Sequence, residues 1–354
     1  MARLLEELRD RIPEDNPALG DARLRRLREQ LPQASINTRK RARLLRQIGV
    51  QELKLGNNSE AAELLQQSYQ LGLDLDPALP AAEISATLFQ LSLAHLRLGE
   101  VQNCAESHTS QSCLFPIEGA GVHRLPLGST LAIEHLLLLL DRDPGNLPAR
   151  WILNIAYMTL GRYPDEVPTD YLIPPAAFES EEAFPRFHEV AADLSLDVMS
   201  LAGGVITDDF DGDGLLDVMV SEWSPAGSLR YFRNRGDGHF DDRTEEAGLA
   251  GIYGGLNIIQ TDYDNDGDLD VFVMRGGWLG KAGRHPNSLL QNDGHGRFTD
   301  VTFAAGLAEI HFPTQTAAWA DLDNDGDLDF YVGNEAYPIQ LFRHSGDGHF
   351  EDVA

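Results

Sequence analysis

One nine-residue pattern of aspartates occurs three times in the second half of this chain. Each copy reads D-x-D-x-D-G-x-x-D, and the copies begin at Asp209, Asp262 and Asp321. Four carboxylates within nine residues repel one another unless a cation lies between them. Hard oxygen ligands in an irregular loop suit Ca²⁺ better than Mg²⁺ or a transition metal, and the glycine at position 6 allows the sharp turn around the ion. The pattern therefore predicts three Ca²⁺-binding loops.

Each loop is expected to supply side-chain ligands from positions 1, 3, 5 and 9 and a backbone carbonyl from position 7. The predicted ligands are Asp209, Asp211, Asp213, Leu215 and Asp217 in the first loop, Asp262, Asp264, Asp266, Asp268 and Asp270 in the second, and Asp321, Asp323, Asp325, Asp327 and Asp329 in the third. The alternative is an acidic, solvated turn that binds no ion. Three copies in matching sequence context favour the metal site.

An EF-hand does not fit the sequence around these loops. It needs a glutamate at position 12 and a helix on each side. Position 12 is Val220, Val273 or Val332, and short β-rich runs stand before and after each loop. Each loop is therefore predicted to connect two strands.

The repeat around each loop contains four predicted strands. A third strand, a tight glycine-containing turn and a fourth strand follow in every copy, and the fourth strands begin at His239, Arg297 and His349. The loops are 53 and 59 residues apart. Four strands in a unit of roughly 50 residues are typical of a propeller blade, so residues 191–354 are predicted to form about three blades.

Residues 1–175 show a helical period instead. Leucine-rich segments recur with a 3.6-residue period, and a stretch around Leu55, Gly56 and Ala61 resembles a tetratricopeptide repeat. A chain of 354 residues commonly forms two domains. The predicted fold class is therefore α + β: a tetratricopeptide-like helical array over 1–175, then part of a calcium-binding β-propeller over 191–354. Residues 176–190 are predicted to form a linker and a first propeller strand.

The strand-rich half resembles the FG-GAP/VCBS repeats of integrin-α-type propellers. Residues 298–302, residues 305–307 and the loop that begins at Asp321 match that repeat closely. Residues 187–354 are similar to bacterial proteins related to cartilage acidic protein, which often carry a C-terminal ASPIC/UnbV domain. This resemblance implies that the aspartate loops bind Ca²⁺. It also implies a non-enzymatic, exported interaction or adhesion module whose partner is a protein or an extracellular polymer.

The number of repeats departs from that family. Its propellers close with about seven blades, whereas three are recognisable here. A sequence that resembles another fourth strand begins at Phe187, and the last repeat stops in mid-pattern at Ala354. We therefore expect a fragment that lacks several blades and any C-terminal domain, with closure by self-association as the alternative. The oligomeric state stays open.

The formal net charge of −28 argues against nucleic acid as a partner, because phosphate backbones would be repelled. No apolar stretch approaches the ~18 residues that predict a membrane span. The N-terminal sequence has no signal-peptide core, although the resemblance implies an extracellular, periplasmic or cell-surface location.

A second group with metal-binding chemistry lies in the helical half, at Cys104, His108, Cys113 and His123. These residues could bind Cu or Zn, although their spacing fits no zinc finger. A disulfide between the two cysteines is the favoured interpretation. The alternative function is a metal-handling or redox accessory protein, or an enzyme, centred on this group. The sequence contains no hydrolase, metalloprotease, P-loop or dinucleotide-binding motif, so neither catalytic residues nor an enzymatic activity is predicted.

Overall fold

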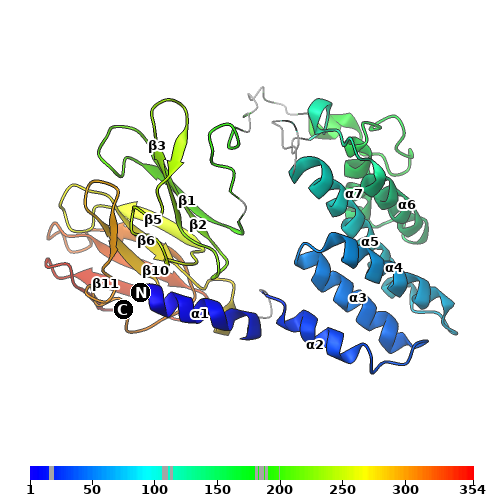
Figure 1. Ribbon diagram of the computed structural model, residues 1–354, viewed down its shortest axis with the longest axis horizontal. Helices are drawn as coiled ribbons and strands as arrows, with labels where there is room; N and C mark the ends of the chain where they lie inside the picture. Colours follow the sequence, from blue (N-terminus) through cyan, green and yellow to red (C-terminus); the bar gives the residue numbers. More distant parts are fainter. Residues whose placement is uncertain are drawn as a thin grey trace. The chain divides into compact units, whose positions relative to one another are not determined.

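The computed structural model describes residues 1–15, 20–105, 111, 115–179, 182, 187, 190–198 and 200–354. They form two compact units, Asp21–Val190 and the combination of Met1–Gly20 with Ala191–Ala354 (Figure 1). A helical first half and a strand-rich second half agree with the predicted α + β class. The first helix, however, groups with the strands, whereas the sequence placed residues 1–175 in one helical domain.

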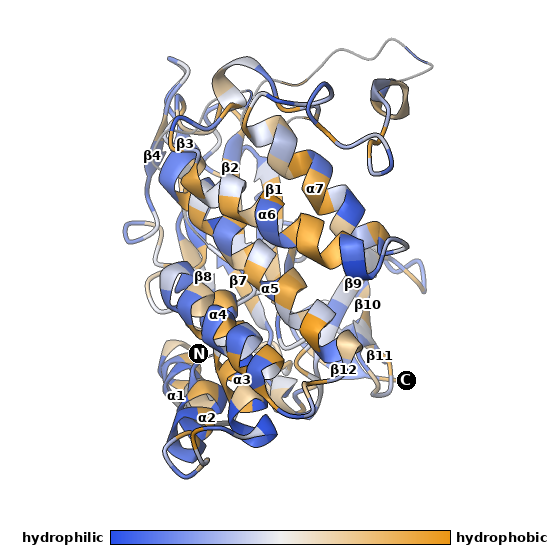
Figure 2. Ribbon diagram, turned by 90° about the vertical axis from the view of Figure 1, so that its right-hand side faces the viewer, coloured by the Kyte–Doolittle hydropathy of each residue, from blue (hydrophilic) through white to orange (hydrophobic). Residues whose placement is uncertain are grey.

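The unit of Asp21–Val190 is built from helices that pack on their neighbours in chain order. They are α2 (Ala22–Gln30), α3 (Arg39–Lys54), α4 (Asn58–Asp74), α5 (Ala81–Glu100), α6 (Leu127–Arg142) and α7 (Leu147–Thr159), with short helical turns η1 (Val101–Ala105), η2 (Gly119–Gly121) and η3 (Pro175–Phe178). Figure 2 shows apolar and polar residues alternating around α5, α6 and α7. This amphipathic pattern buries one stripe of each helix in the core, where Leu88, Leu136 and Leu153 are fully enclosed.

Two sequence features set the helix ends and spacing in this unit. The side chains of Thr38 and Asn146 accept hydrogen bonds from the N–H groups of Arg41 and Ala149, and so cap α3 and α7. A Cβ added at Gly49 would lie 2.7 Å from the Leu65 side chain, so the missing side chain allows α3 and α4 to approach closely. Small residues at helix crossings are compatible with a tetratricopeptide-like array, which stays a prediction.

The described residues of the strand unit form three antiparallel sheets of four strands, each ordered as in the chain. They are β1 (Ala202–Asp208), β2 (Asp217–Glu222), β3 (Arg230–Asn234) and β4 (Phe240–Asp242); β5 (Asn257–Thr261), β6 (Asp270–Met274), β7 (Ser288–Asn292) and β8 (Phe298–Asp300); and β9 (Thr314–Ala320), β10 (Asp329–Asn334), β11 (Gln340–His344) and β12 (Phe350–Asp352). The prediction of four strands per repeat is therefore confirmed.

The three sheets stack through both faces of the middle one. All five residues of β6 are buried, and successive side chains point to opposite faces. Val271 and Val273 join a core cluster with the first sheet, whereas Phe272 and Met274 join a cluster with the third. The first strands also lie side by side, because β1 contacts β5 and β5 contacts β9.

The outward face of the third sheet is more open than its counterparts. Tyr331 occupies the position of Met219 in the first sheet and Phe272 in the second, yet its exposed fraction is 43%, against 0% and 2%. Leu322 is likewise exposed, whereas the equivalent Phe210 is buried. The same packing surface therefore recurs in all three sheets. The described residues cover it in the first and second sheets and leave it exposed in the third.

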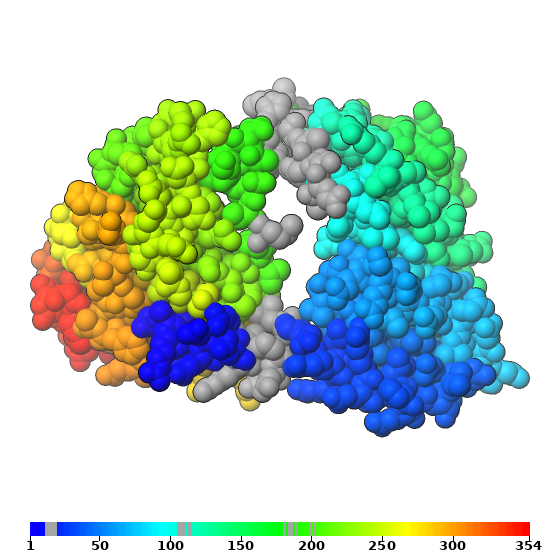
Figure 3. Space-filling model, in the orientation of Figure 1, coloured from blue at the N-terminus to red at the C-terminus, as the bar shows by residue number. Residues whose placement is uncertain are grey.

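Helix α1 (Ala2–Asp15) packs within the strand unit, and Figure 3 shows its atoms against that unit. Leu5 is buried, and the Arg9 guanidinium lies 4.9 Å from the centroid of the Tyr253 ring. Arg9 Nη1 also donates a 2.9 Å hydrogen bond to the Tyr253 hydroxyl. A cation over an aromatic face is favourable, so these contacts explain why α1 belongs with the strands.

A pH dependence follows from two histidines in the helical core. His95 on α5 stacks on His135 of α6, with ring centroids 5.3 Å apart. Burial, aided by the neighbouring imidazole, lowers the pKa of His95 to about 4. The unfolded value is about 6.5, so the unfolded chain binds more protons between these values. The stability due to neutral His95 is present above about pH 6.5 and is lost as the pH falls towards 4.

We therefore expect His95→Leu to reduce the loss of helix stability on acidification. The measurement is thermal unfolding by far-ultraviolet circular dichroism at pH 7.5 and pH 5. His239→Gln is the matched control, because that imidazole is exposed and lies in the other unit. An unchanged difference between the two pH values in His95→Leu would contradict this explanation.

Candidate metal-binding loops

Each aspartate loop connects the first and second strands of one sheet. Position 9 pairs with the last residue of the preceding strand in all three cases: Asp208 with Asp217, Thr261 with Asp270 and Ala320 with Asp329. Strands and not helices flank each loop, so the exclusion of an EF-hand is correct. The shared register places the three loops at equivalent ends of their sheets.

The loops fold by hydrogen bonding their own carboxylates to backbone N–H groups. Position 1 accepts from positions 5 and 6 in every copy; in the first loop Asp213 N and Gly214 N donate to Asp209 at 3.0 and 2.8 Å. The same two bonds recur at Asp262 and Asp321. They wrap the chain around its own acidic groups, which is the geometry that a cation needs.

Position 6 needs a left-handed backbone. The φ angles of Gly214, Gly267 and Gly326 lie between 86° and 97°, and in each case no heavy atom lies within 4 Å of an added Cβ. The requirement for glycine is therefore conformational and not steric.

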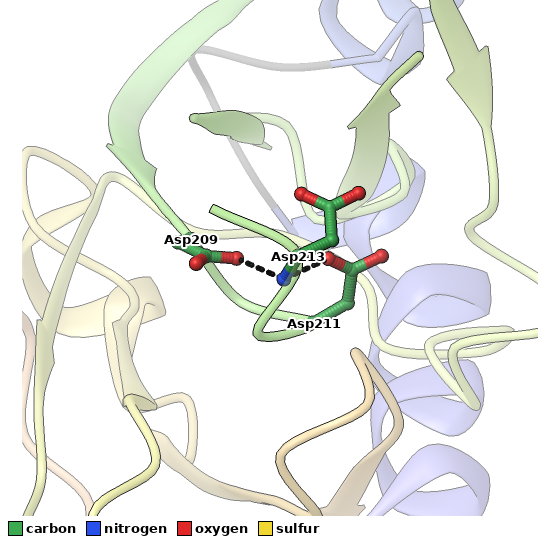
Figure 4. A group of neighbouring side chains, drawn as sticks. All are labelled: Asp209, Asp211 and Asp213. Carbon is green, nitrogen blue, oxygen red and sulfur yellow. Dashed lines mark hydrogen bonds between the residues drawn. The ribbon is translucent and has the colours of Figure 1, made fainter. Parts of the chain in front are cut away.

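Three groups of carboxylates converge in these loops. They are Asp209, Asp211 and Asp213; Asp262, Asp264 and Asp270; and Asp321, Asp323 and Asp325. Within each group, one oxygen from each residue lies within 4.8 Å of the others. Figure 4 shows the first group, with Asp213 N donating to both Asp209 and Asp211. The predicted ligands outside these groups are Asp217, Asp266 and Asp329 and the position-7 residues Leu215, Asp268 and Asp327.

The position-9 carboxylates are buried and fasten each loop to its sheet. They accept backbone N–H groups from the third strand at 2.7–2.9 Å: Asn234 to Asp217, Asn292 to Asp270 and His344 to Asp329. Burial raises the pKa of Asp270 to about 7, against the effect of two backbone N–H donors that lower it. Burial also raises the pKa of Asp217. The protein alone therefore holds these charges in an environment that disfavours them.

The second loop shows most directly that a cation fits. Asp264 Oδ2 accepts a 2.6 Å bond from Gln291, whereas Asp264 Oδ1 is buried and has no hydrogen-bond partner among the described residues. Burial raises the pKa of Asp264, and the charges of Asp266 and Asp262 raise it further. A buried carboxylate oxygen without a donor is costly, and a hard cation beside it would remove that cost.

The first loop differs, because a guanidinium already lies on it. Arg233 on β3 donates through Nε to Asp211 and through Nη2 to Asp213, the latter at 2.8 Å. These contacts raise the pKa of Arg233, most strongly through the hydrogen bond to Asp211. Reasoning from the sequence missed this residue. The available signal was its place next to Asn234 at the end of the third strand, where the later repeats have Gln291 and Arg343.

Of the second predicted group, the structure describes two members. Cys104 Sγ lies 3.6 Å from His123 Nε2, and His123 Nδ1 lies 3.0 Å from Ser129 Oγ. Burial lowers the pKa of His123. His108 and Cys113 lie outside the described residues, so the disulfide and the Cu or Zn site stay predictions.

Comparison with known proteins bears on the strand unit. A family model for FG-GAP-like repeats matches residues 209–273 and 278–332. The chain is 28% identical over 201 residues to cartilage acidic protein 1 of Homo sapiens, covering 56% of this chain and 28% of the human protein. It is 28% identical over 152 residues to the Xenopus tropicalis protein (42% and 22%) and 27% over 201 residues to the Mus musculus protein (56% and 29%).

The chain contains FG-GAP-like repeats and is homologous to cartilage acidic protein 1. The matched region spans less than a third of each of these relatives. The first match of the FG-GAP-like model runs from the first aspartate loop into β6, and the second ends in β10 just after the third loop. In the described part of the chain, the helices are too short or too polar to cross a membrane.

The loop backbone can be tested by Gly267→Ala. The added methyl group meets no atom, so the cost comes only from the left-handed φ of 96° and amounts to about 1–2 kcal/mol of unfolding free energy. Chemical denaturation of the whole chain measures it. The control is Gly145→Ala, whose φ is not left-handed and whose Cβ would come no closer than 4.0 Å to Asp143. Equal effects of the two substitutions would refute the conformational argument.

Proposed function

We propose that this chain is a non-enzymatic interaction module whose strand unit is stabilised by Ca²⁺ in its three aspartate loops. The observation that carries the proposal is Asp264 Oδ1, a buried carboxylate oxygen that lacks a donor within a group of converging carboxylates. The ligands in each loop are the side chains at positions 1, 3, 5 and 9 and the backbone carbonyl at position 7. Calcium suits the all-oxygen donor set and the irregular loop.

The proposed role of the ion is to stabilise the fold. It would neutralise carboxylates that the fold holds together, and would fix the connection between the first two strands of each sheet. Loops of this kind commonly work where Ca²⁺ is at millimolar concentration, so we place the protein in an extracellular, periplasmic or cell-surface setting.

The interaction role rests on the stacked sheets. We infer that they are blades of a propeller, because each sheet has four strands and the first strands lie side by side. The open face of the third sheet, with Leu322 and Tyr331, suits a further sheet of the same kind. A protein or an extracellular polymer is the proposed partner of the assembled module, and the FG-GAP-like repeats of this chain and its homology to cartilage acidic protein 1 support this class of function.

Elemental analysis of the purified, dialysed chain tests the ion. We expect about three Ca²⁺ per chain, one for each converging group, together with a rise in melting temperature when Ca²⁺ is restored after chelation. A stoichiometric Cu or Zn that Cys104→Ser abolishes, with no effect of Ca²⁺, would replace this proposal by a metal-handling role of the Cys104 and His123 pair.

A point substitution tests the ligand assignment. Asp264→Asn keeps the side-chain shape but removes the charge, so it should remove one bound Ca²⁺ and lower the melting temperature of the calcium-loaded protein. The calcium-free protein should keep or gain stability, because the substitution removes a charge that burial disfavours. Titration calorimetry and thermal unfolding measure these effects, with the exposed Glu309→Gln as control. Equal destabilisation with and without Ca²⁺ would contradict the assignment.

A further inference from the structure

The three loops share a pattern but differ in how their charge is balanced. The first has leucine at position 7, Leu215, where the others have Asp268 and Asp327. It therefore carries four carboxylates and the others five. The first loop also holds a cation of the protein's own, Arg233, whose contacts join positions 3 and 5.

Every carboxylate oxygen in the first converging group already accepts an N–H. Asp209 accepts Asp213 N and Gly214 N through its two oxygens. Asp211 and Asp213 each accept a backbone N–H through Oδ1 and the guanidinium through Oδ2. Each of these oxygens keeps a second lone pair, so the backbone donors can stay when a cation binds, as at position 1 of the other loops. The guanidinium is different because it is itself positive and lies on the Oδ2 atoms of Asp211 and Asp213. A Ca²⁺ bound to these atoms must displace it, which a rotation of the Arg233 side chain allows.

The matching positions of the other repeats do not block their loops in this way. Gln291, in the second sheet, is neutral and bonds one oxygen of Asp264, leaving the other buried and without a donor among the described residues. Arg343, in the third, lies 3.9 Å from Glu351 and makes no ion pair with its loop in the part of the chain that the structure describes. Only the first loop therefore combines fewer carboxylates with a guanidinium on the ligand oxygens.

We propose that Arg233 is a built-in counter-ion that competes with Ca²⁺ for Asp211 and Asp213, so that the first loop is the weakest of the three sites. This inference rests on the proposed function, because it presumes Ca²⁺ in all three loops. The first loop is stable without an ion and fills last, while the second and third need the ion to offset their charge. The Asp211 side chain is 11% exposed and that of Arg233 is 38% exposed. The carboxylate is therefore largely shielded from water, whereas the guanidinium has room to move away from it.

The test is calcium titration calorimetry of the whole chain and of Arg233→Gln, which gives the first repeat the residue of the second. The wild type should show two tighter sites and one weaker site. In Arg233→Gln the weakest site should tighten roughly tenfold, the scale of one charge-assisted hydrogen-bonded pair that need no longer be broken. The melting temperature of the calcium-free variant should fall, because the first loop loses its counter-ion.

Three further variants make the result specific. Arg343→Gln is the matched control and should change neither the affinities nor the calcium-free melting temperature. Arg233→Lys keeps the charge but lacks the two-pronged geometry, so the affinity of its weakest site should lie between those of the wild type and Arg233→Gln. It takes the place of Arg233→Gln in the test if that variant does not fold. Adding Asp209→Asn to Arg233→Gln should abolish the tightened site and so assign it to the first loop.

Three outcomes overturn the inference, and they can be told apart. Three equal sites that Arg233→Gln leaves unchanged would leave the calcium function standing and remove Arg233 from it. A wild type that binds no Ca²⁺ in any loop would overturn the proposed function and, with it, the role of Arg233. Weaker binding in Arg233→Gln would show that the guanidinium supports the site and does not compete for it.

Discussion

Repulsion between carboxylates held within one short loop is the constraint on which the strand unit depends. Backbone N–H groups relieve part of it, because they point at positions 1, 5 and 9 of each loop. They do not remove the charge, and burial raises the pKa of Asp270 in spite of them. The loop is therefore shaped by its hydrogen bonds but keeps an unbalanced negative charge, which the proposed Ca²⁺ would offset.

The loops also lie where neighbouring sheets meet, so their charge state bears on the stack as a whole. In the first loop, the carbonyl of Phe210 accepts bonds from Gly296 N and from the Asn292 side chain of the second sheet. In the second loop, Asn265 donates to Asp327 of the third. An ion that fixes one loop would thus also fix its contacts with the next sheet. The proposed Ca²⁺ would in this way strengthen the contacts between the repeats as well as the single turns.

Much of this arrangement is predictable from the sequence, because it depends on local pattern. The loop motif, the strands on each side of it and the four-strand repeat follow from aspartate spacing, β-branched residues and glycine turns. The attachment of α1 does not, because it depends on Arg9 meeting Tyr253, two residues far apart in the chain. Arg233 was missed for a similar reason: only the pairing of β2 with β3 places its side chain on the first loop.

The repeated sequence thus determines the backbone of the three loops, while single residue differences between the repeats determine the charge of each loop. The backbone bonds of position 1 recur in all three loops at 2.8–3.2 Å, so this backbone tolerates changes at other positions. Leu215 at position 7 and Arg233 beside the first loop both lower the local negative charge, and they do so in the same repeat. Because both differences lie in the first loop, the three loops have similar backbones but unequal negative charge for a cation to offset. If the loops bind Ca²⁺ as proposed, a graded response to the ion would therefore arise from one repeated loop without any change of fold.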